Sequence, residues 1–177
     1  MSHSKIAAGA QFPECTVQDQ SGQTRDISQI DDDAQWRVVV VYRGRHCPIC
    51  KQYLKQLDTL VAKLAEMHVD VVALSADSPA QLQAFAEEVD VSVPLYGALS
   101  LETMRELGLY ISEPRNANET DHPFPEPGVF VINERGQVQI VEISNAPFAR
   151  PDLDMLVDGI KFIRENSYPI RGTLGNA

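Results

Sequence analysis

Two cysteines separated by two residues are the part of this sequence best suited to chemistry: Cys47 and Cys50, with Pro48 and Ile49 between them. A thiolate is a strong nucleophile, and two thiols at this spacing at the start of a helix can form a reversible disulfide. One thiol can attack a substrate and the other can then release it. Free cysteines also serve as small apolar core residues, but a pair at this spacing favours dithiol–disulfide exchange.

Charged residues flank the cysteine pair. Arg43 and Arg45 precede it and Lys51 follows it. A nearby positive charge favours the thiolate over the thiol, so we expect Arg43 to be the electrostatic helper of the reaction. His46, directly before Cys47, is a second candidate at the substrate-binding side of the motif, where it could donate a proton or lower the proton affinity of the thiol.

The elements around the motif predict how it is positioned. Arg37–Tyr42 is a continuous β-branched run, typical of a central strand that is buried on both faces. From Pro48 the apolar residues recur at helical spacing and form one stripe, which predicts a helix with one buried face. Val69–Leu74 is a second apolar run and predicts another buried strand. The order strand, helix, strand indicates a parallel α/β arrangement with the motif at a strand-to-helix turn. Unpaired backbone N–H groups of the first helical turn would then lie near a sulfur.

The remaining periodicities complete an α/β domain. We expect a hairpin from Cys15–Gln18 and Thr24–Ile27, helices after Ser78, at Thr103–Leu107 and at Asp152–Asn166, a strand at Val91–Tyr96, and a second hairpin from Val129–Asn133 and Gln137–Ile143. The stretch from Ile111 to Gly128 contains four prolines and predicts a long irregular loop, which in a compact domain is often functional.

Length and charge restrict the class of protein. The 177 residues suit one domain spanning 1–177, with its core at about 9–165. The formal net charge of −10 opposes binding to nucleic acid or to an anionic membrane surface. We find no signal peptide and no apolar run long enough to cross a membrane, so we expect a cytoplasmic protein. Three cysteines are an odd number, which disfavours a disulfide-stapled secreted fold.

Several segments together resemble the thioredoxin superfamily, and within it the peroxiredoxin-like alkyl hydroperoxide reductase and thiol-specific antioxidant family (AhpC/TSA, redoxin). The resemblance is carried by Phe12-Pro13 with the following hairpin, residues 38–44, the Cys47–Cys50 motif, residues 74–78 and residues 127–133. It implies an α/β thioredoxin-like fold, in which helices flank a central mixed β-sheet and an N-terminal β-hairpin extends it.

The resemblance also implies a function. The chain would be an antioxidant thiol oxidoreductase whose cysteine pair reduces hydroperoxides or protein disulfides. It would use no cofactor, and a cellular thiol reductant of the thioredoxin or glutathione type would regenerate the dithiol. Since relatives are often dimers, a homodimer is one expectation for the assembly.

Two family patterns assign opposite roles to the cysteines, and both stay open at this point. The peroxiredoxin pattern places the attacking cysteine at Cys50, with Arg43 where a proline is usual and Cys47 where a threonine is usual. The thioredoxin pattern makes Cys47 the nucleophile and Cys50 the resolving thiol, and it places Pro127 at the cis-proline that shapes the substrate site. An ordinary turn proline is the alternative for Pro127. A second arginine usual before the late strand is replaced by Pro127.

Three other residues have side chains that could take part in chemistry. Cys15, on the predicted hairpin, is expected to be a buried structural thiol, with a distant resolving role as the alternative. His122 could join the cysteine pair in a copper or zinc site, which makes a metal-binding module the alternative function. A catalytically silent interaction domain is a third possibility. Asp77 is expected to be solvated surface.

Overall fold

A five-stranded mixed sheet forms the centre of the protein, whose computed structural model describes residues 4–31 and 33–175. In spatial order the strands are β5 (Leu95–Tyr96), β4 (Val69–Leu74), β3 (Trp36–Val41), β8 (Gly128–Ile132) and β9 (Val138–Ile143). The first three are parallel, β8 pairs antiparallel with β3, and β9 pairs antiparallel with β8. The expected mixed sheet, with the β-branched run at its centre, is confirmed.

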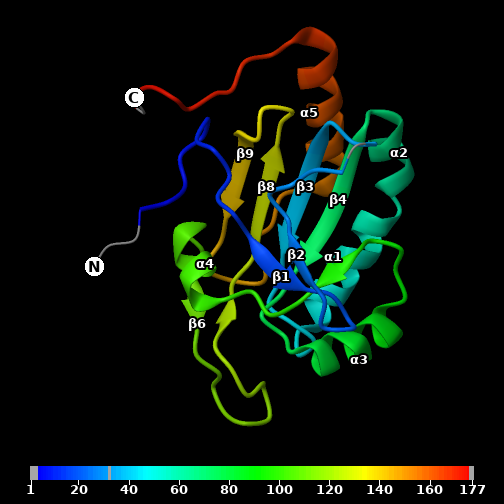
Figure 1. Ribbon diagram of the computed structural model, residues 1–177, viewed down its shortest axis with the longest axis vertical. Helices are drawn as coiled ribbons and strands as arrows, with labels where there is room; N and C mark the ends of the chain where they lie inside the picture. Colours follow the sequence, from blue (N-terminus) through cyan, green and yellow to red (C-terminus); the bar gives the residue numbers. More distant parts are fainter. Residues whose placement is uncertain (1–3, 32, 176–177) are drawn as a thin grey trace.

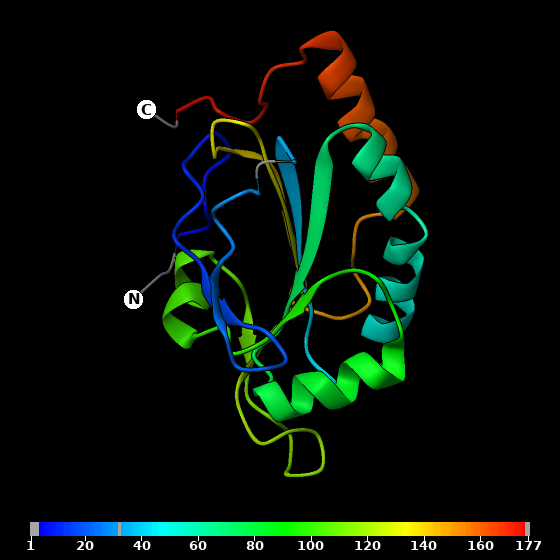
Figure 2. The ribbon, with the colours of Figure 1, turned by 45° about the vertical axis from the view of Figure 1, so that its right-hand side comes forward.

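The two faces of the sheet are covered differently (Figure 1). One face carries α1 (Pro48–Asp58), α2 (Val61–Glu66), α3 (Pro79–Val89) and α5 (Leu153–Asn166). The other carries the hairpin of β1 (Thr16–Gln18) and β2 (Thr24–Asp26) together with α4 (Leu101–Glu106). Figure 2, which shows the sheet nearly edge-on, separates these two layers. Among the described helices, none is both long and apolar enough to cross a membrane.

Strand β3 explains why the sheet is buried on both sides. Val38 and Val40 belong to the core under the helices, while Val39 and Val41 belong to the core under the hairpin. This alternation follows from the two-residue period of a strand, so a continuous apolar run is required. The strand therefore ends inside the core, a few residues before the turn that carries the cysteines.

Two local elements differ from the sequence expectations. The helix after Pro48 divides in two at Thr59, where the backbone N–H and hydroxyl of Thr59 both donate to the carbonyl of Gln56, at 3.1 and 2.6 Å. Such i to i+3 bonds tighten and end an α-helical turn. The predicted irregular stretch contains two short paired strands, β6 (Ile111–Ser112) and β7 (Phe124–Pro125), which anchor both ends of the 113–123 loop.

A buried ion pair ties the hairpin layer to the sheet, and we expect its loss to destabilise the fold. The guanidinium of Arg37, 4% exposed, forms two bonds to Asp70 at 2.8 and 2.7 Å and two to the carbonyls of Ile27 and Gln29. Asp70→Ala removes both charge-assisted bonds and leaves the buried guanidinium with only the exposed carboxylate of Asp31, at 3.5 Å, as counter-charge. This change should lower the free energy of unfolding by about 2 kcal/mol. Urea unfolding measures the change.

The matched control for Asp70→Ala is the exposed ion pair between Lys63 and Asp158. Because exposed pairs contribute little, Asp158→Ala should cost less than about 1 kcal/mol. Equal losses in the two variants would contradict the assigned role of the Arg37–Asp70 pair.

Candidate active site

The cysteine pair lies at the start of α1, as the sequence predicted. Cys47 is the N-cap residue, and its sulfur accepts a hydrogen bond from the backbone N–H of Cys50 at 3.3 Å. The two residues are joined by a disulfide, with their Cα atoms 5.3 Å apart. Both cysteines are buried, whereas Pro48 and Ile49 between them are exposed. A dithiol–disulfide pair at a helix N-terminus is therefore present in the folded chain.

Arg150 is the cation that contacts the sulfurs. Its Nη2 lies 3.0 Å from Sγ of Cys50 and 3.9 Å from Sγ of Cys47. The guanidinium lies over the ring of Tyr53 at 5.0 Å, and its Nε donates to the carbonyl of Pro147 at 2.7 Å. These contacts hold the charge against Cys50. Burial is also the main reason why the pKa of Arg150 is lowered from its ordinary value.

Sequence reasoning missed Arg150. It lies in the loop between β9 and α5, 100 positions after Cys50. No spacing rule connects an arginine in that loop to the motif. The only local signal is its place between Pro147 and Pro151, two residues that stiffen the loop.

Arg43, the expected helper, makes different contacts. Its Nε lies 3.0 Å from Glu126 and its Nη2 lies 3.8 Å from Glu119, and the guanidinium lies 4.8 Å from the centre of the Phe124 ring. Both carboxylates are at most 6% exposed, so the charge of Arg43 is compensated locally. Within the described residues we find no hydrogen bond from Arg43 to Cys47 or Cys50.

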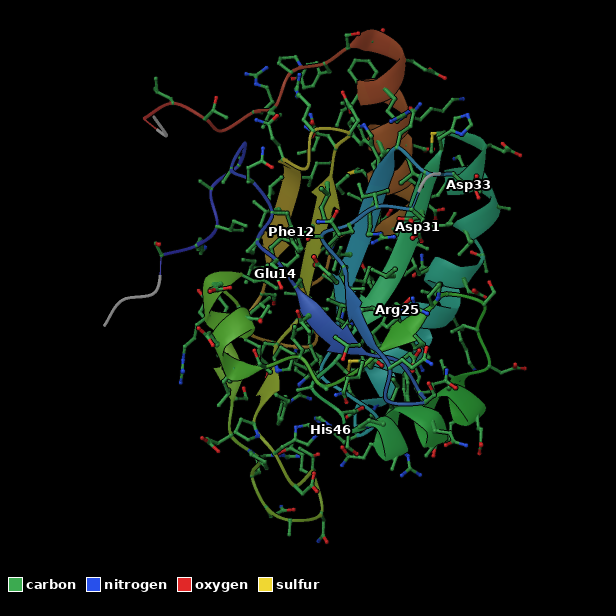
Figure 3. All side chains as sticks on the ribbon, in the orientation of Figure 1. Phe12, Glu14, Arg25, Asp31, Asp33 and His46 are labelled. Atoms are coloured by element: carbon green, nitrogen blue, oxygen red, sulfur yellow. A yellow bond between two sulfur atoms is a disulfide. The ribbon has the colours of Figure 1, made fainter. Side chains whose placement is uncertain are left out.

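His46 lies beside the motif but its ring points toward Phe124, with the ring centres 4.5 Å apart. Figure 3 shows His46 at the end of the molecule where α3 and the 113–123 loop approach one another. Burial, and secondarily the charge of Arg43, lowers the pKa of His46, so the ring is neutral near pH 7. Neither ring nitrogen has a hydrogen-bond partner among the described residues. The role of His46 as a proton donor stays a prediction.

Pro127 does not have the geometry of the thioredoxin pattern. All peptide bonds in residues 4–31 and 33–175 are trans, including the one before Pro127. Of the two alternatives, the structure therefore agrees with an ordinary trans proline directly before β8, and a substrate-binding role of Pro127 stays a prediction. Pro127 nevertheless lines a cavity of about 10 Å³ together with Tyr53 and Arg150, a space that holds about one water molecule.

Three further expectations can be compared with the structure. Cys15 is a free thiol that is fully buried in the core under the hairpin, and burial raises its pKa to about 12, which supports the structural reading. His122 lies against Asp77, with Nε2 and Oδ1 3.3 Å apart. Among the described residues no group of three or more His, Cys, Asp or Glu side chains could hold a metal ion, so the metal-binding alternative lacks a ligand set. Asp77 is only 1% exposed, and its assignment to the surface is wrong.

Comparisons with known proteins concern the chain as a whole. Residues 8–141 match the model of the AhpC/TSA family. Alkyl hydroperoxide reductase C of Amphibacillus xylanus is 24% identical over 144 residues, which are 80% of this chain and 74% of that protein. The namesake protein of Staphylococcus epidermidis is 26% identical over 137 residues, 77% and 70% of the two chains.

Solved structures show the same fold. A peroxiredoxin-like protein from Aquifex aeolicus superposes with a TM-score of 0.75 at 21% identity, over 92% of this chain and 90% of that one. Peroxidoxin BcpB from Mycobacterium tuberculosis gives a TM-score of 0.71 at 20% identity, over 89% and 98%. At these identities the likeness concerns the fold alone.

Proposed function

Because this chain belongs to the AhpC/TSA family, we propose that it reduces hydroperoxides in a cycle in which Cys50 attacks the peroxide and Cys47 resolves the product. Membership of the family makes it a peroxiredoxin-family enzyme, an antioxidant peroxidase built on the thioredoxin fold. The finer assignments, namely the nucleophile, the helper residues and the substrate, are proposals that the geometry of the site supports.

The position of Arg150 is the observation that supports Cys50 as the nucleophile. The guanidinium is 0.9 Å closer to Cys50 than to Cys47, since the two distances are 3.0 and 3.9 Å. In the dithiol form the same N–H would face a Cys50 thiolate, and a charge-assisted hydrogen bond of this kind favours the ionised sulfur. Arg43 cannot do this equally well, because its charge is paired with Glu126.

The proposed reaction has two steps. The Cys50 thiolate attacks the terminal peroxide oxygen, which keeps its proton, and the O–O bond breaks, so that Cys50 becomes a sulfenic acid. The alkoxide or hydroxide leaves and takes a proton from solvent. The Cys47 thiolate then attacks the sulfur of Cys50, the S–O bond breaks as the disulfide forms, and the hydroxide leaves and takes a proton from solvent to become water. An external thiol reductant of the thioredoxin or glutathione class supplies the two electrons that restore both thiols.

The spacing of the pair makes the second step local. Cα atoms 5.3 Å apart are within the range of ordinary disulfides, so Cys47 reaches Cys50 without unwinding α1. Both sulfurs are buried, which favours a small hydroperoxide over a bulky substrate in the first step.

A second candidate function is disulfide reduction with Cys47 as the nucleophile. It is favoured by the N-cap position of Cys47, whose sulfur receives the backbone N–H of Cys50. A Cys47 thiolate would be stabilised by that N–H and by the helix dipole.

Stopped-flow measurements separate the two candidates. Reduced wild type, Cys50→Ser and Cys47→Ser are mixed with hydrogen peroxide, and thiol loss is followed. We expect Cys50→Ser to lose the fast reaction and Cys47→Ser to keep the first turnover. Slow reaction of all three proteins, combined with insulin-disulfide reduction that requires Cys47, would instead identify a thioredoxin-like reductase.

A further inference from the structure

Both ring nitrogens of His122 face hydrogen-bond acceptors. Nδ1 lies 2.9 Å from the carbonyl oxygen of Pro123, while Nε2 lies 3.3 Å from Oδ1 of Asp77 and 3.2 Å from Oε1 of Gln81. A neutral imidazole has a single N–H, so one nitrogen would present a lone pair to another lone pair. Only the imidazolium form satisfies all of these contacts.

The amide of Gln81 cannot turn to relieve the conflict. Its Oε1 accepts the backbone N–H of Ser78 at 2.9 Å, which forms the capping box of α3, and its Nε2 donates to Asp121 at 2.9 Å. Rotation of the amide would break both bonds. The oxygen therefore stays directed at His122.

Asp77 connects His122 to the redox motif. Its Oδ2 accepts the backbone N–H of Arg45 at 2.8 Å, two residues before Cys47. Gly44 makes this approach feasible, because it has φ +138° and an added Cβ would lie 2.8 Å from Oδ1 of Asp77. A carboxylate that is 1% exposed needs a counter-charge, and the contact with His122 supplies it.

We propose that His122 is a positioning residue of the redox site: its imidazolium pairs with Asp77, which holds the turn of Gly44 and Arg45 and thereby the position of Cys47. This inference rests on the proposed peroxidase function. It adds a dependence of the reaction on the protonation of a residue that does not contact either sulfur.

The charged groups around His122 favour its protonated form. Asp77 faces it from the β4–α3 connection and Asp121, at 3.8 Å, from its own loop. His46 faces it from the turn before α1, and its pKa is lowered first by burial, then by the charge of Arg43 and least by His122. The hydrogen bond to Asp77 is the main cause that raises the pKa of His122. The contact is therefore complete below the ordinary histidine pKa and is lost as the pH rises through the raised value.

The pH profile of the peroxide reaction tests this role in the full-length protein. The wild-type rate should fall at alkaline pH although more thiolate is present. His122→Phe, which has no donor, should react about tenfold more slowly than wild type at neutral pH and show no alkaline fall. His122→Gln, which donates an N–H at every pH, should recover most of the rate, also without the fall. A wild-type rate and profile in His122→Phe would overturn the proposal.

Two measurements do not depend on peroxide chemistry. NMR of the wild type should show that His122 stays an imidazolium at pH values above those at which an ordinary histidine loses its proton. Hydrogen exchange at the backbone amide of Arg45 should be about tenfold faster in His122→Phe than in wild type. The control is His68→Asn, an exposed histidine with φ 58°, which asparagine tolerates. An ordinary titration of His122 with unchanged exchange at Arg45 would refute the positioning role alone. A peroxidase that survives Cys50→Ser would refute the proposed function alone.

Discussion

Replacing Arg150 by methionine should slow the reaction of Cys50 with hydrogen peroxide by roughly a hundredfold, the typical effect of removing a donor aimed at a developing charge. The reason is the 3.0 Å contact between Nη2 and the sulfur of Cys50, which the methionine side chain cannot make. The pH at which Cys50 becomes half-alkylated by iodoacetamide should rise by about one to two units in the same variant. Stopped-flow kinetics and an alkylation series, both in a Cys47→Ser background, give these two numbers.

Two further variants sharpen the assignment of Arg150. Arg150→Lys keeps a positive charge and should recover part of the rate. The double variant Arg43→Met/Glu126→Gln removes the 3.0 Å ion pair of the other arginine without leaving a buried charge unpaired, and it should react within about threefold of wild type. If the double variant lost as much activity as Arg150→Met, Arg43 would be the activating cation, as the sequence alone suggested.

Removing Cys47 should convert a protein that resists overoxidation into one that is inactivated within its first turnovers. In wild type the resolving thiol is within disulfide distance of Cys50 in the folded chain, with Cα atoms 5.3 Å apart, so the sulfenic acid is consumed at once. In Cys47→Ser the sulfenic acid persists, and a second peroxide oxidises it to sulfinic acid. Mass spectrometry under excess peroxide should find the sulfinic form in most of the variant and in little of the wild type.

Cys15→Ala is the matched control for Cys47→Ser. Cys15 is fully buried in the core under the hairpin, and its pKa of about 12 keeps it a thiol. Its removal should leave the resistance to overoxidation unchanged. Overoxidation of Cys15→Ala to the level of Cys47→Ser would show that Cys15 takes part in resolving the sulfenic acid, the alternative that its sequence position left open.

The principal elements could be predicted because each is encoded locally. The β-branched run of β3 is buried on both faces, and the helices α1, α3 and α5 lie where the apolar periodicity indicated. Pro48 fits the first helical turn and Asp152 is the N-cap of α5, so these two helices begin where short-range capping rules place them. The break at Thr59 was not predicted, because the apolar stripe continues across it and only the backbone hydrogen bonds change.

The candidate site was predictable only in part. The cysteine pair, its place at a strand-to-helix turn and its pairing follow from residues 47–50 and their neighbours. The partners of Arg43 and Arg150 could not be predicted from these neighbouring residues. Arg43 is close to the motif in sequence, yet it pairs with Glu126, whereas Arg150 lies 100 positions away and contacts Cys50.

The sequence by itself determined an α/β domain with a cysteine pair at a strand-to-helix turn, because strand and helix periodicity, capping and motif spacing act over a few residues, and its motifs resembled those of the thioredoxin superfamily. Only the tertiary structure decided which cation faces the sulfurs, that the carboxylate of Asp77 is buried, and that the bond before Pro127 is trans. These features arise where loops from distant parts of the chain meet at one end of the sheet. Which charges pair there and which side chains are buried depends on how these loops pack against one another. No local pattern of residues specifies that packing.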